Sequence, residues 1–324
     1  MSIPCPFDPE LGLMLAGAHR QLTATLTPEA LPVLAPLASK PAQTLTEFIG
    51  SRAIQAVDYT IPGYQGAEIG ITVFSLKDRR SKANAPAFYY IHGGGMVMGH
   101  RLLGADFMLP YVEEFDAVIA TIEYRLAPEN PDPAPVEDCY AGLLWLTTQW
   151  ETLGIDPKKI MVVGHSAGAG IAAGMTLLAR DRGGPDIAWQ LLASPMLDDR
   201  NATLSSRQYE DIGVWNAKSN QTGWKAYLGD RLGGPDVSIY AAPARALDSK
   251  TGLANLPRTY LDVGSAEVFR DEVVAYANGI WAAGGSADLH VWAGGFHGFD
   301  MWGTPRLTQE ALTARHNWVR RMLR

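Results

Sequence analysis

The sequence has few cysteines, no long apolar run and no excess of basic residues. Its 324 residues include only Cys5 and Cys139, too few for a disulfide framework or a zinc site built on thiolates. No run approaches the roughly 18 apolar residues that a membrane span requires. The first residues make a poor signal peptide, because no basic region leads into the short apolar stretch 11–18. We therefore expect a cytoplasmic protein without stable membrane association.

The charge balance is acidic, and the composition is that of a folded protein. Lys and Arg number 27 against 34 Asp and Glu, which gives a formal net charge of −7. Nucleic acid and anionic membrane surfaces are therefore not expected partners. Hydrophobic residues make up 47% of the chain and charged residues 19%, which excludes a disordered chain. The length fits one large core with a modest appendage.

Short β-branched and aromatic runs alternate with segments of helical period from about residue 53 onward. Several runs are almost continuously apolar, which is typical of strands covered on both faces. This pattern predicts an α/β fold with a mostly parallel central sheet flanked by helices. The predicted strands are Ala56–Thr60, Ile69–Ser75, Ala87–Ile91, Val118–Glu123, Ile160–Gly164, Trp189–Ser194, Arg258–Val263 and Asp288–Trp292. Helical faces are clearest at 136–144 and 307–322.

Two regions interrupt this alternation. Residues 1–52 contain only segments of helical character, at 8–25 and 45–52, and residues 198–248 carry aromatic side chains without strand period. We interpret residues 1–52 as an N-terminal cap segment and about 198–248 as a cap insertion within a catalytic domain that spans 53–324. Together they would form a mainly helical cap over one end of the sheet. An ordinary pair of flanking helices is the alternative for the N-terminal segment.

The strongest chemical motif is G-x-S-x-G at Gly164–Gly168. It follows the apolar run 160–163 and precedes a helical segment at 171–178, the strand–turn–helix context that this motif requires. A sharp turn there holds Ser166 in strained dihedral angles above the sheet, where it can act as a nucleophile. The backbone N–H of Ala167, at the start of the helix, is free to donate to an oxyanion. The glycines do not form G-x-G-x-x-G, so a dinucleotide site is not favoured.

A second glycine-rich turn, His92–Gly95, follows the predicted strand 87–91. Three consecutive glycines cost conformational entropy, so this turn must need bare backbone. In the fold that carries the serine motif, a loop at this place supplies further oxyanion donors. We favour the N–H groups of Gly94 and Gly95 as donors, while Gly93 either shapes the turn or donates itself. A plain tight turn is the alternative interpretation.

The serine requires a base, and the base requires an acid. Of the seven histidines, His297 is the best candidate because it follows the last predicted strand in a loop that contains glycines. The acid should lie between the serine and this histidine, after the penultimate strand. Glu267 occupies that loop, so we predict a triad of Ser166, Glu267 and His297. Asp262 and Asp271 remain alternative acids.

Together these motifs resemble the hormone-sensitive-lipase-like branch of the α/β-hydrolases, also called bacterial family IV esterases. The resemblance spans about residues 87–299. It rests on an ordered set of motifs: His92–Gly95, Tyr124–Glu129 with Pro133, Ala134 and Asp138, Gly164–Gly168, Arg270–Glu272, and His297–Phe299. By this resemblance, Arg125 and Asp138 brace the glycine loop instead of acting as catalysts.

Three positions depart from the family pattern. Glu267 stands where most relatives carry Asp, so its loop must absorb one extra methylene group. Met96 follows the glycine loop where relatives usually place an aromatic residue, and His165 precedes the serine where they commonly have Asp. Flexible Met96 and Met98 are candidates for an adaptable apolar substrate pocket, and we expect His165 to contribute to it.

The resemblance implies a serine carboxylesterase that hydrolyses short- to medium-chain esters through an acyl-enzyme intermediate. It implies no metal or organic cofactor and a small-molecule ester as partner, and relatives often form homodimers. Two other functions remain open. One is an amidase, peptidase or acyltransferase that uses the same triad, and the other is a catalytically silent ligand receptor. The receptor interpretation predicts loss of the histidine, whereas His297 is present.

Overall fold

The computed structural model describes residues 3–18, 25–80, 83–249 and 252–324. Within these ranges an eight-stranded sheet has the order β1-β2-β4-β3-β5-β6-β7-β8. The strands are β1 (Ile54–Pro62), β2 (Glu68–Leu76), β3 (Ala85–Ile91), β4 (Val118–Glu123), β5 (Ile155–His165), β6 (Trp189–Ala193), β7 (Arg258–Gly264) and β8 (Ala287–Trp292). β2 is antiparallel to β1 and β4, and all other neighbours are parallel. The predicted α/β fold with a mostly parallel sheet is confirmed.

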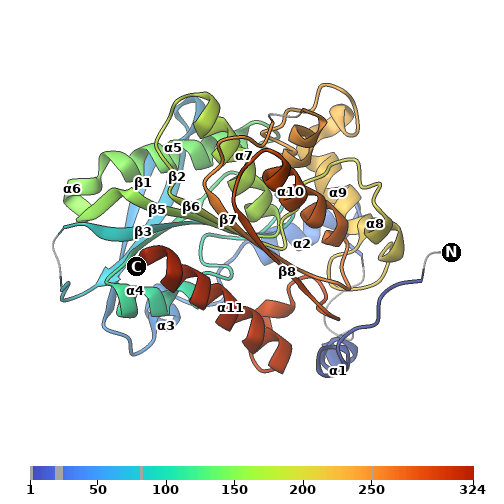
Figure 1. Ribbon diagram of the computed structural model, residues 1–324, viewed down its shortest axis with the longest axis horizontal. Helices are drawn as coiled ribbons and strands as arrows, with labels where there is room; N and C mark the ends of the chain where they lie inside the picture. Colours follow the sequence, from blue (N-terminus) through green and yellow to red (C-terminus); the bar gives the residue numbers. More distant parts are fainter. Residues whose placement is uncertain (1–2, 19–24, 81–82, 250–251) are drawn as a thin grey trace.

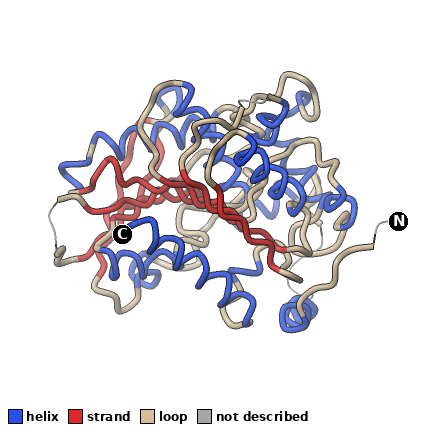
Figure 2. The backbone as a smooth tube through the Cα atoms, viewed as in Figure 1, coloured by secondary structure: helices blue, strands red, loops and turns tan. Residues whose placement is uncertain are grey.

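Helices cover both faces of this twisted sheet. The α-helices of the described residues are α1 (Pro9–Ala18), α2 (Leu31–Ala38), α3 (Leu45–Ile49), α4 (Leu109–Phe115), α5 (Ala134–Thr148), α6 (Trp150–Leu153), α7 (Ala167–Asp181), α8 (Leu204–Gln208), α9 (Ala217–Leu228), α10 (Arg270–Ala282) and α11 (Arg306–Leu323). Short 3₁₀ helices are η1 (Tyr64–Gly66), η2 (Asp106–Met108), η3 (Gly229–Arg231), η4 (Pro243–Asp248) and η5 (Phe299–Met301). In Figure 1, α5, α7 and α10 lie on one face of the sheet, and α3, α4 and α11 lie on the other. Figure 2 shows the strands as one layer between these helices.

Alternate residues of each central strand point to opposite faces, so the sheet separates two apolar cores. On β3, Tyr89 belongs to the core beneath α5, α7 and α10. Its neighbours Phe88 and Tyr90 belong to the core that includes α4 and α11. The Phe88 ring stacks on Tyr111 of α4 with centroids 5.1 Å apart. Burial on both faces explains why these strands are almost continuously apolar in sequence.

Each predicted strand corresponds to an observed one, and the largest difference is at the start of β5. The strand begins at Ile155, five residues before the predicted run, and Ile155 pairs with Ala85 across an irregularity in register. Polar residues at 156, 158 and 159 hide this extension in the sequence. The helical faces at 136–144 and 307–322 lie in α5 and α11. Of the helical segment predicted at 8–25, α1 covers 9–18, while 19–24 lie outside the described residues.

The N-terminal residues divide among three places. The segment before α2 lies against α9, because the Leu26 N–H donates to Ser219 Oγ and the Leu26 carbonyl accepts from Thr222 Oγ1, at 2.8 and 2.9 Å. α1 packs instead beside Phe296 and the start of α11. α3 packs on the sheet near Phe74. Residues 25–28 thus meet the 198–248 insertion, and so does the segment before α1, where the Cys5 carbonyl accepts from the Tyr209 hydroxyl at 3.0 Å.

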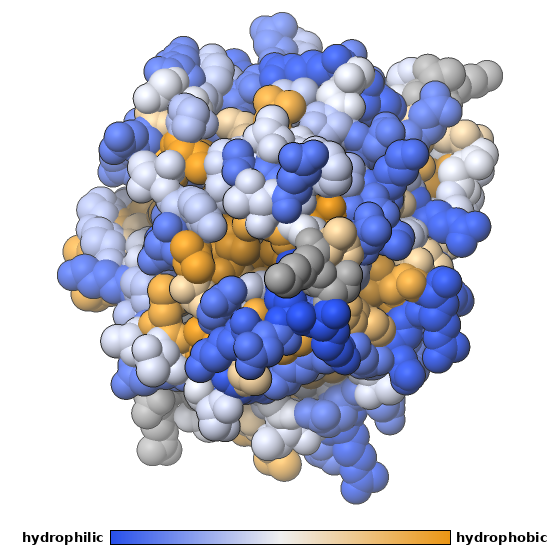
Figure 3. Space-filling model, turned by 90° about the vertical axis from the view of Figure 1, so that its left-hand side faces the viewer, coloured by the Kyte–Doolittle hydropathy of each residue, from blue (hydrophilic) through white to orange (hydrophobic). Residues whose placement is uncertain are grey.

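No helix within the described ranges has both the length and the apolar character needed to cross a bilayer. Figure 3 views the side of the molecule that carries α6. Polar residues cover most of this face, and apolar residues gather in groups between them. Trp150 of α6 is one of the exposed apolar side chains of the chain. Apolar groups of this kind are normal on a folded protein and indicate no particular partner.

Candidate active site

Ser166 occupies the sharp turn between β5 and α7. Its backbone has φ 56° and ψ −123°, and a positive φ is strained for a residue with a side chain. The turn has no room for side chains at its two glycines. A Cβ on Gly168 would lie 2.2 Å from the Ile91 carbonyl oxygen, and a Cβ on Gly164 would lie 2.5 Å from the Ala169 Cα. The motif G-x-S-x-G therefore fits this turn because the backbone segments approach too closely for larger residues.

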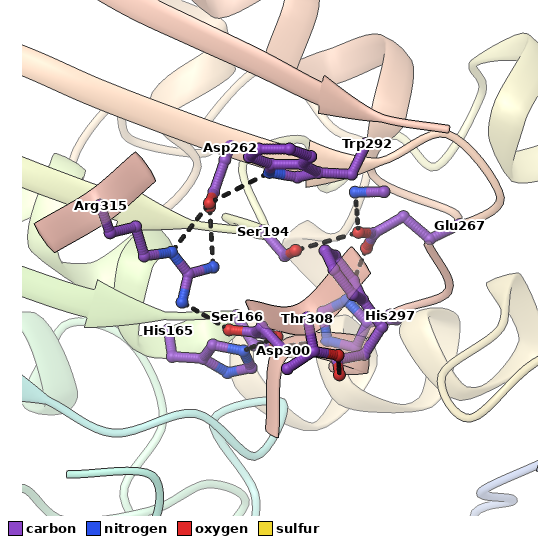
Figure 4. Close-up of polar contacts among 12 residues, drawn as sticks. His165, Ser166, Ser194, Asp262, Glu267, Trp292, His297, Asp300, Thr308 and Arg315 are labelled. Atoms are coloured by element: carbon purple, nitrogen blue, oxygen red, sulfur yellow. Dashed lines mark hydrogen bonds and ion pairs between the residues drawn. The ribbon is translucent and has the colours of Figure 1, made fainter. Parts of the chain in front are cut away.

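His297 lies in the loop between β8 and η5, and its imidazole points toward the serine turn (Figure 4). Nε2 is 2.8 Å from Ser166 Oγ, and Nδ1 is 2.6 Å from Glu267 Oε2. With Nδ1–H donating to the carboxylate, Nε2 is left to accept from the serine hydroxyl. The Phe269 ring also packs against the imidazole in a T-shaped arrangement, with centroids 4.9 Å apart. The structure thus brings the three predicted residues into one chain of hydrogen bonds.

Glu267 is held by both of its carboxylate oxygens. While Oε2 contacts the histidine, Oε1 accepts from Ser194 Oγ at 2.9 Å and from the Gly264 N–H at 2.8 Å. The residue is 1% exposed, so these partners replace water around the carboxylate. The loop therefore accommodates the longer Glu side chain by giving its second oxygen two donors.

The two alternative acids lie elsewhere. Asp262, within β7, makes a two-point ion pair with Arg315 of α11, at 2.8 and 2.9 Å. Asp271, at the start of α10, accepts from Arg270 Nε and from the Ser205 N–H. Neither carboxylate contacts the histidine, so the geometry favours Glu267 over both.

The glycine loop after β3 has left-handed backbone at two of its glycines, with φ +118° at Gly94 and +63° at Gly95. The Gly94 carbonyl accepts from the N–H groups of Val97 and Met98, which closes the turn. Among the described residues, no hydrogen bond engages the N–H groups of Gly94, Gly95 or Ala167. These donors are therefore available beside the serine, and Gly93 lies closest to it, since a Cβ there would be 3.1 Å from the Ser166 Cβ.

His92, the first residue of this loop, belongs to its support. Its ring stacks on Tyr124 with centroids 4.3 Å apart, and the Tyr124 hydroxyl donates to the His92 carbonyl at 2.9 Å. Burial lowers the pKa of His92 to about 3. The ring therefore stays neutral at physiological pH and is not a competing base.

Arg125 and Asp138 brace the neighbouring segment. Their side chains form a two-point ion pair with both contacts at 2.8 Å, and Asp138 also accepts from the backbone N–H groups of Arg125 and Tyr64. The side chain of Asp138 is fully buried. The segment joins the glycine loop through the Ala127 N–H, which donates to the Met96 carbonyl at 2.9 Å. Both residues lie behind the loop and outside the pocket lining.

A pocket of about 320 Å³ opens at Ser166. It is lined by Gly93, Gly94, Gly95, Met98, Leu103, His165, Ser166, Val214, Trp215, His297, Gly298, Met301 and Trp302. The Trp215 ring lies so close to Gly95 that a Cβ on this glycine would be 2.3 Å from it. The 198–248 insertion therefore supplies part of an apolar wall directly over the glycine loop.

Of the three residues expected to bind substrate, Met98 and His165 line this pocket and Met96 does not. Met96 is fully buried in the core on the α5 and α7 side of the sheet. Its backbone has φ +66°, and its carbonyl is held by Ala127. The expectation that Met96 shapes the pocket therefore needs correction, because the turn directs this side chain into the core.

A buried ionic chain reaches the site from α11 (Figure 4). The Asp262–Arg315 pair continues to Asp300 of η5, whose Oδ2 accepts from Arg315 Nη1 at 2.6 Å. The other oxygen of Asp300 lies 3.2 Å from His165 Nε2. Burial opposes ionisation of Asp300, but Arg315 and His165 outweigh it and hold the pKa of Asp300 below its usual range. This ionic chain thus connects His165, the residue before the nucleophile, to Asp300 in the turn after His297.

The sequence patterns predicted neither this buried ionic chain nor most of the pocket wall. Arg315 shares the apolar face of the last helix with Ala311 and Trp318, an unusual place for a cation and a signal of burial. Met301 and Trp302 follow His297 closely in sequence, which could have marked them as pocket residues. Trp215 carries no such signal, because only the folded insertion brings it to the glycine loop.

Comparison with known proteins agrees with this geometry. A profile of the α/β hydrolase fold family matches residues 88–301. Esterase LipI of Mycobacterium tuberculosis (strain ATCC 25618 / H37Rv) is 33% identical over 238 residues, which are 73% of this chain and 72% of LipI. Carboxylesterase NlhH of the same strain is 32% identical over 207 residues, so the match spans 64% of each chain.

Solved structures are similar over almost the whole chain. A bacterial heroin esterase has a TM-score of 0.85 and 35% identity, with 98% of each chain covered. An esterase of Pyrobaculum calidifontis has a TM-score of 0.84 and 27% identity, covering 98% of this chain and 99% of its own. The family resemblance inferred from the motifs is confirmed. The chain belongs to the α/β-hydrolases, in their hormone-sensitive-lipase-like branch of carboxylic ester hydrolases.

Proposed function

We propose that this protein is a serine carboxylesterase. The observation that carries the proposal is the chain of hydrogen bonds from Ser166 through His297 to Glu267, with contacts of 2.8 and 2.6 Å. A serine hydroxyl is a poor nucleophile at its ordinary pKa and needs a base within hydrogen-bonding distance. The esterase names of the family relatives support an ester as the substrate.

In the proposed reaction, Ser166 Oγ attacks the ester carbonyl carbon while its proton passes to His297 Nε2. Glu267 keeps the imidazole oriented and stabilises the cation that forms. The tetrahedral intermediate collapses when the C–O bond to the alcohol breaks and His297 returns the proton to the leaving oxygen. Water, deprotonated by the same histidine, then attacks the acyl carbon. The acid is released when the bond to Ser166 Oγ breaks and His297 returns the proton to that oxygen.

The negative charge on the tetrahedral oxygen needs fixed donors. We assign this role to the N–H groups of Gly94, Gly95 and Ala167, which have no partner among the described residues. Ala167 begins α7, so the helix N-terminus adds a favourable partial positive charge. Donors of this type typically contribute about 100- to 1,000-fold each to the rate.

The pocket favours short- to medium-chain esters. Its volume of about 320 Å³ suits a small ester, and the walls that Trp215, Trp302 and Met98 supply are apolar. We further propose that residues 25–38 and 198–248 act together as the cap over this pocket, since Leu26 is bonded to α9 in both directions.

Hydrolysis of matched substrates tests the proposed function. The purified protein is incubated with p-nitrophenyl acetate, butyrate and decanoate and with butyryl p-nitroanilide, and release of the chromophore is followed. We expect turnover of the two shorter esters, slower turnover of the decanoate and little turnover of the anilide. An anilide rate equal to the ester rate would indicate an amidase, and no turnover of any substrate would contradict the proposal.

A further inference from the structure

His165 places a second imidazole in the pocket, directly before the nucleophile in sequence. Its side chain lines the cavity, and its ring centroid is 6.0 Å from that of His297. The chemistry proposed above assigns it no role, because the base is His297. An imidazole inside an otherwise largely apolar cavity is a candidate for contact with a polar group of the substrate.

The orientation of this imidazole is fixed from behind. Nε2 lies 3.2 Å from Asp300 Oδ1, and Asp300 is anchored by Arg315, which Asp262 holds in turn. All four residues are buried, with exposed fractions of 9% or less. A buried ionic chain costs desolvation free energy, so it is more readily explained by orienting a functional group than by stability alone.

Asp300 also determines which nitrogen carries the proton. Although burial opposes its ionisation, Arg315 holds the pKa of Asp300 below the usual range, so Asp300 is a carboxylate and accepts a hydrogen bond from Nε2–H of His165. In the neutral imidazole the lone pair then resides on Nδ1. In this neutral form, His165 presents a hydrogen-bond acceptor and not a donor to the pocket.

Nδ1 itself is open. Among the described residues it has no hydrogen-bond partner, since the one polar contact of the His165 side chain is through Nε2. A Cβ on Gly93 would lie 3.4 Å from Nδ1 and 3.1 Å from the Ser166 Cβ. The same Cβ would lie 2.9 Å from the His165 carbonyl oxygen, so the backbone of Gly93 packs tightly beside both groups. The space that the acceptor and the nucleophile share is the pocket, which His165 and Ser166 both line.

We propose that His165 is a specificity residue whose Nδ1 accepts a hydrogen bond from a hydroxyl group of the substrate, so that the preferred substrates are hydroxylated short-chain esters. This inference rests on the proposed esterase function and deepens it. The hydroxyl can belong to the acyl group or to the alcohol group of the ester, and the experiment below separates these two sources. One neutral hydrogen bond to a substrate corresponds to about a 3- to 10-fold preference.

The test compares isosteric pairs of esters. In the acyl pair, ethyl 3-hydroxybutyrate (each enantiomer) is compared with ethyl 3-methylbutyrate, and in the alcohol pair, propyl butyrate is compared with its 2-hydroxyethyl counterpart. Each kcat/KM, measured by pH-stat, is divided by the alkaline hydrolysis rate of the same ester to remove intrinsic reactivity. We expect the wild-type protein to favour the hydroxylated member of at least one pair by about 3- to 10-fold. Ethyl 3-oxobutyrate, which has an acceptor in place of the hydroxyl, should show no such preference.

Two matched variants assign the preference to Nδ1. In His165→Asn the amide oxygen can take the position of Nδ1, whereas in His165→Gln the amide reaches only the position of Nε2. We expect the ratio of hydroxylated to isosteric ester to be retained in His165→Asn and to fall to about one in His165→Gln. The ratio is informative even if both variants lose overall activity, because both substrates of a pair are affected equally.

The outcomes separate this inference from the proposed function. Hydrolysis of propyl butyrate without any preference within either pair overturns the role of His165 and leaves the esterase intact. An equal preference for the 3-oxo ester, or a preference that persists in His165→Gln, also overturns it. No hydrolysis of any of these esters overturns the esterase function and this inference with it. If both variants fail to fold, a wild-type ratio of about one in both pairs, or an equal preference for the 3-oxo ester, still overturns the inference.

Discussion

The Ser194 hydroxyl donates to Glu267 Oε1 at 2.9 Å, on the side of the carboxylate away from His297. Ser194 directly follows β6 and has φ 43°, so a strained residue just beyond the neighbouring strand holds the acid. The Gly264 N–H adds a second donor at 2.8 Å. With these two donors on Oε1, the longer Glu side chain keeps its contact with the imidazole through Oε2.

The identity of the acid can be tested by two substitutions. Glu267→Gln should lower kcat by about 1,000- to 10,000-fold, because an amide nitrogen facing Nδ1 favours the wrong tautomer of His297. Glu267→Asp shortens the side chain, so one carboxylate cannot reach both Ser194 and the imidazole. We expect a loss of about 10- to 100-fold, typical of a displacement of about 1 Å. Steady-state kinetics with p-nitrophenyl butyrate measure both, with melting temperatures as the folding control.

Removing the support behind the acid should have a smaller effect. Ser194→Ala deletes one neutral hydrogen bond to Glu267 and leaves the Gly264 N–H in place, so we expect kcat to fall about 3- to 10-fold with little change in KM. Thr147→Ala, at an exposed hydroxyl that bonds only its own helix, is the matched control. Equal kinetics for Ser194→Ala and the wild type would show that the acid is positioned without Ser194.

The buried ion pairs of Arg315 should dominate the charge contribution to stability. Arg315→Met leaves Asp262 and Asp300 buried without their cation, which should cost about 3–5 kcal/mol. Arg306 of the same helix pairs with Glu10 on the surface, and its side chain is 89% exposed. Arg306→Met should therefore change the free energy of unfolding by less than about 1 kcal/mol. Denaturant unfolding of the two variants and the wild type measures both changes in the free energy of unfolding. Equal changes would contradict the larger contribution assigned to the buried ion pairs of Arg315.

Glu272 should make stability depend on pH. It is 2% exposed, and its Oε1 accepts from the Leu197 and Asp198 N–H groups, while Oε2 has no partner among the described residues. Burial raises the pKa of Glu272 well above its usual range. The folded state therefore keeps a proton that the unfolded state releases, and stability falls as pH rises from about 4.3 toward the folded pKa, by about 1.4 kcal/mol per pH unit.

Glu272→Gln provides the comparison, since its amide oxygen can accept the same two N–H groups and does not titrate. The stability of the wild type relative to this variant should decrease between pH 4.5 and pH 7. Unfolding midpoints at several pH values follow this difference, and parallel curves for the two proteins would exclude a titrating Glu272.

Residues whose positions depend on their sequence neighbours, or on the order of the strands, could be predicted from the sequence. Ser166 is marked by the glycines that its turn requires, and His297 by its place after the last strand. Glu267 follows from the order of elements along the chain, although the donor Ser194 does not. The positions of these residues could be predicted because the steric demands of one turn, or the order of the strands, determine which residues occupy them.

Contacts between distant elements were not predictable from the same patterns. The link from Arg315 to Asp300 depends on how α11 packs against η5, and Trp215 reaches the glycine loop through the fold of an irregular insertion. The sequence neighbours of Met96 suggest a place in the pocket, yet a positive φ turns its side chain into the core. Packing and backbone direction, which periodicity does not encode, decide these three positions.

The most direct test of the central claim is covalent trapping of the nucleophile. The protein is treated with a fluorophosphonate, and the modified site is identified by intact mass and peptide sequencing. We expect one adduct per chain, on Ser166, no adduct in Ser166→Ala, and ester hydrolysis by that variant lowered by at least about 1,000-fold. Modification of a different residue, or hydrolysis by Ser166→Ala at the wild-type rate, would contradict the account.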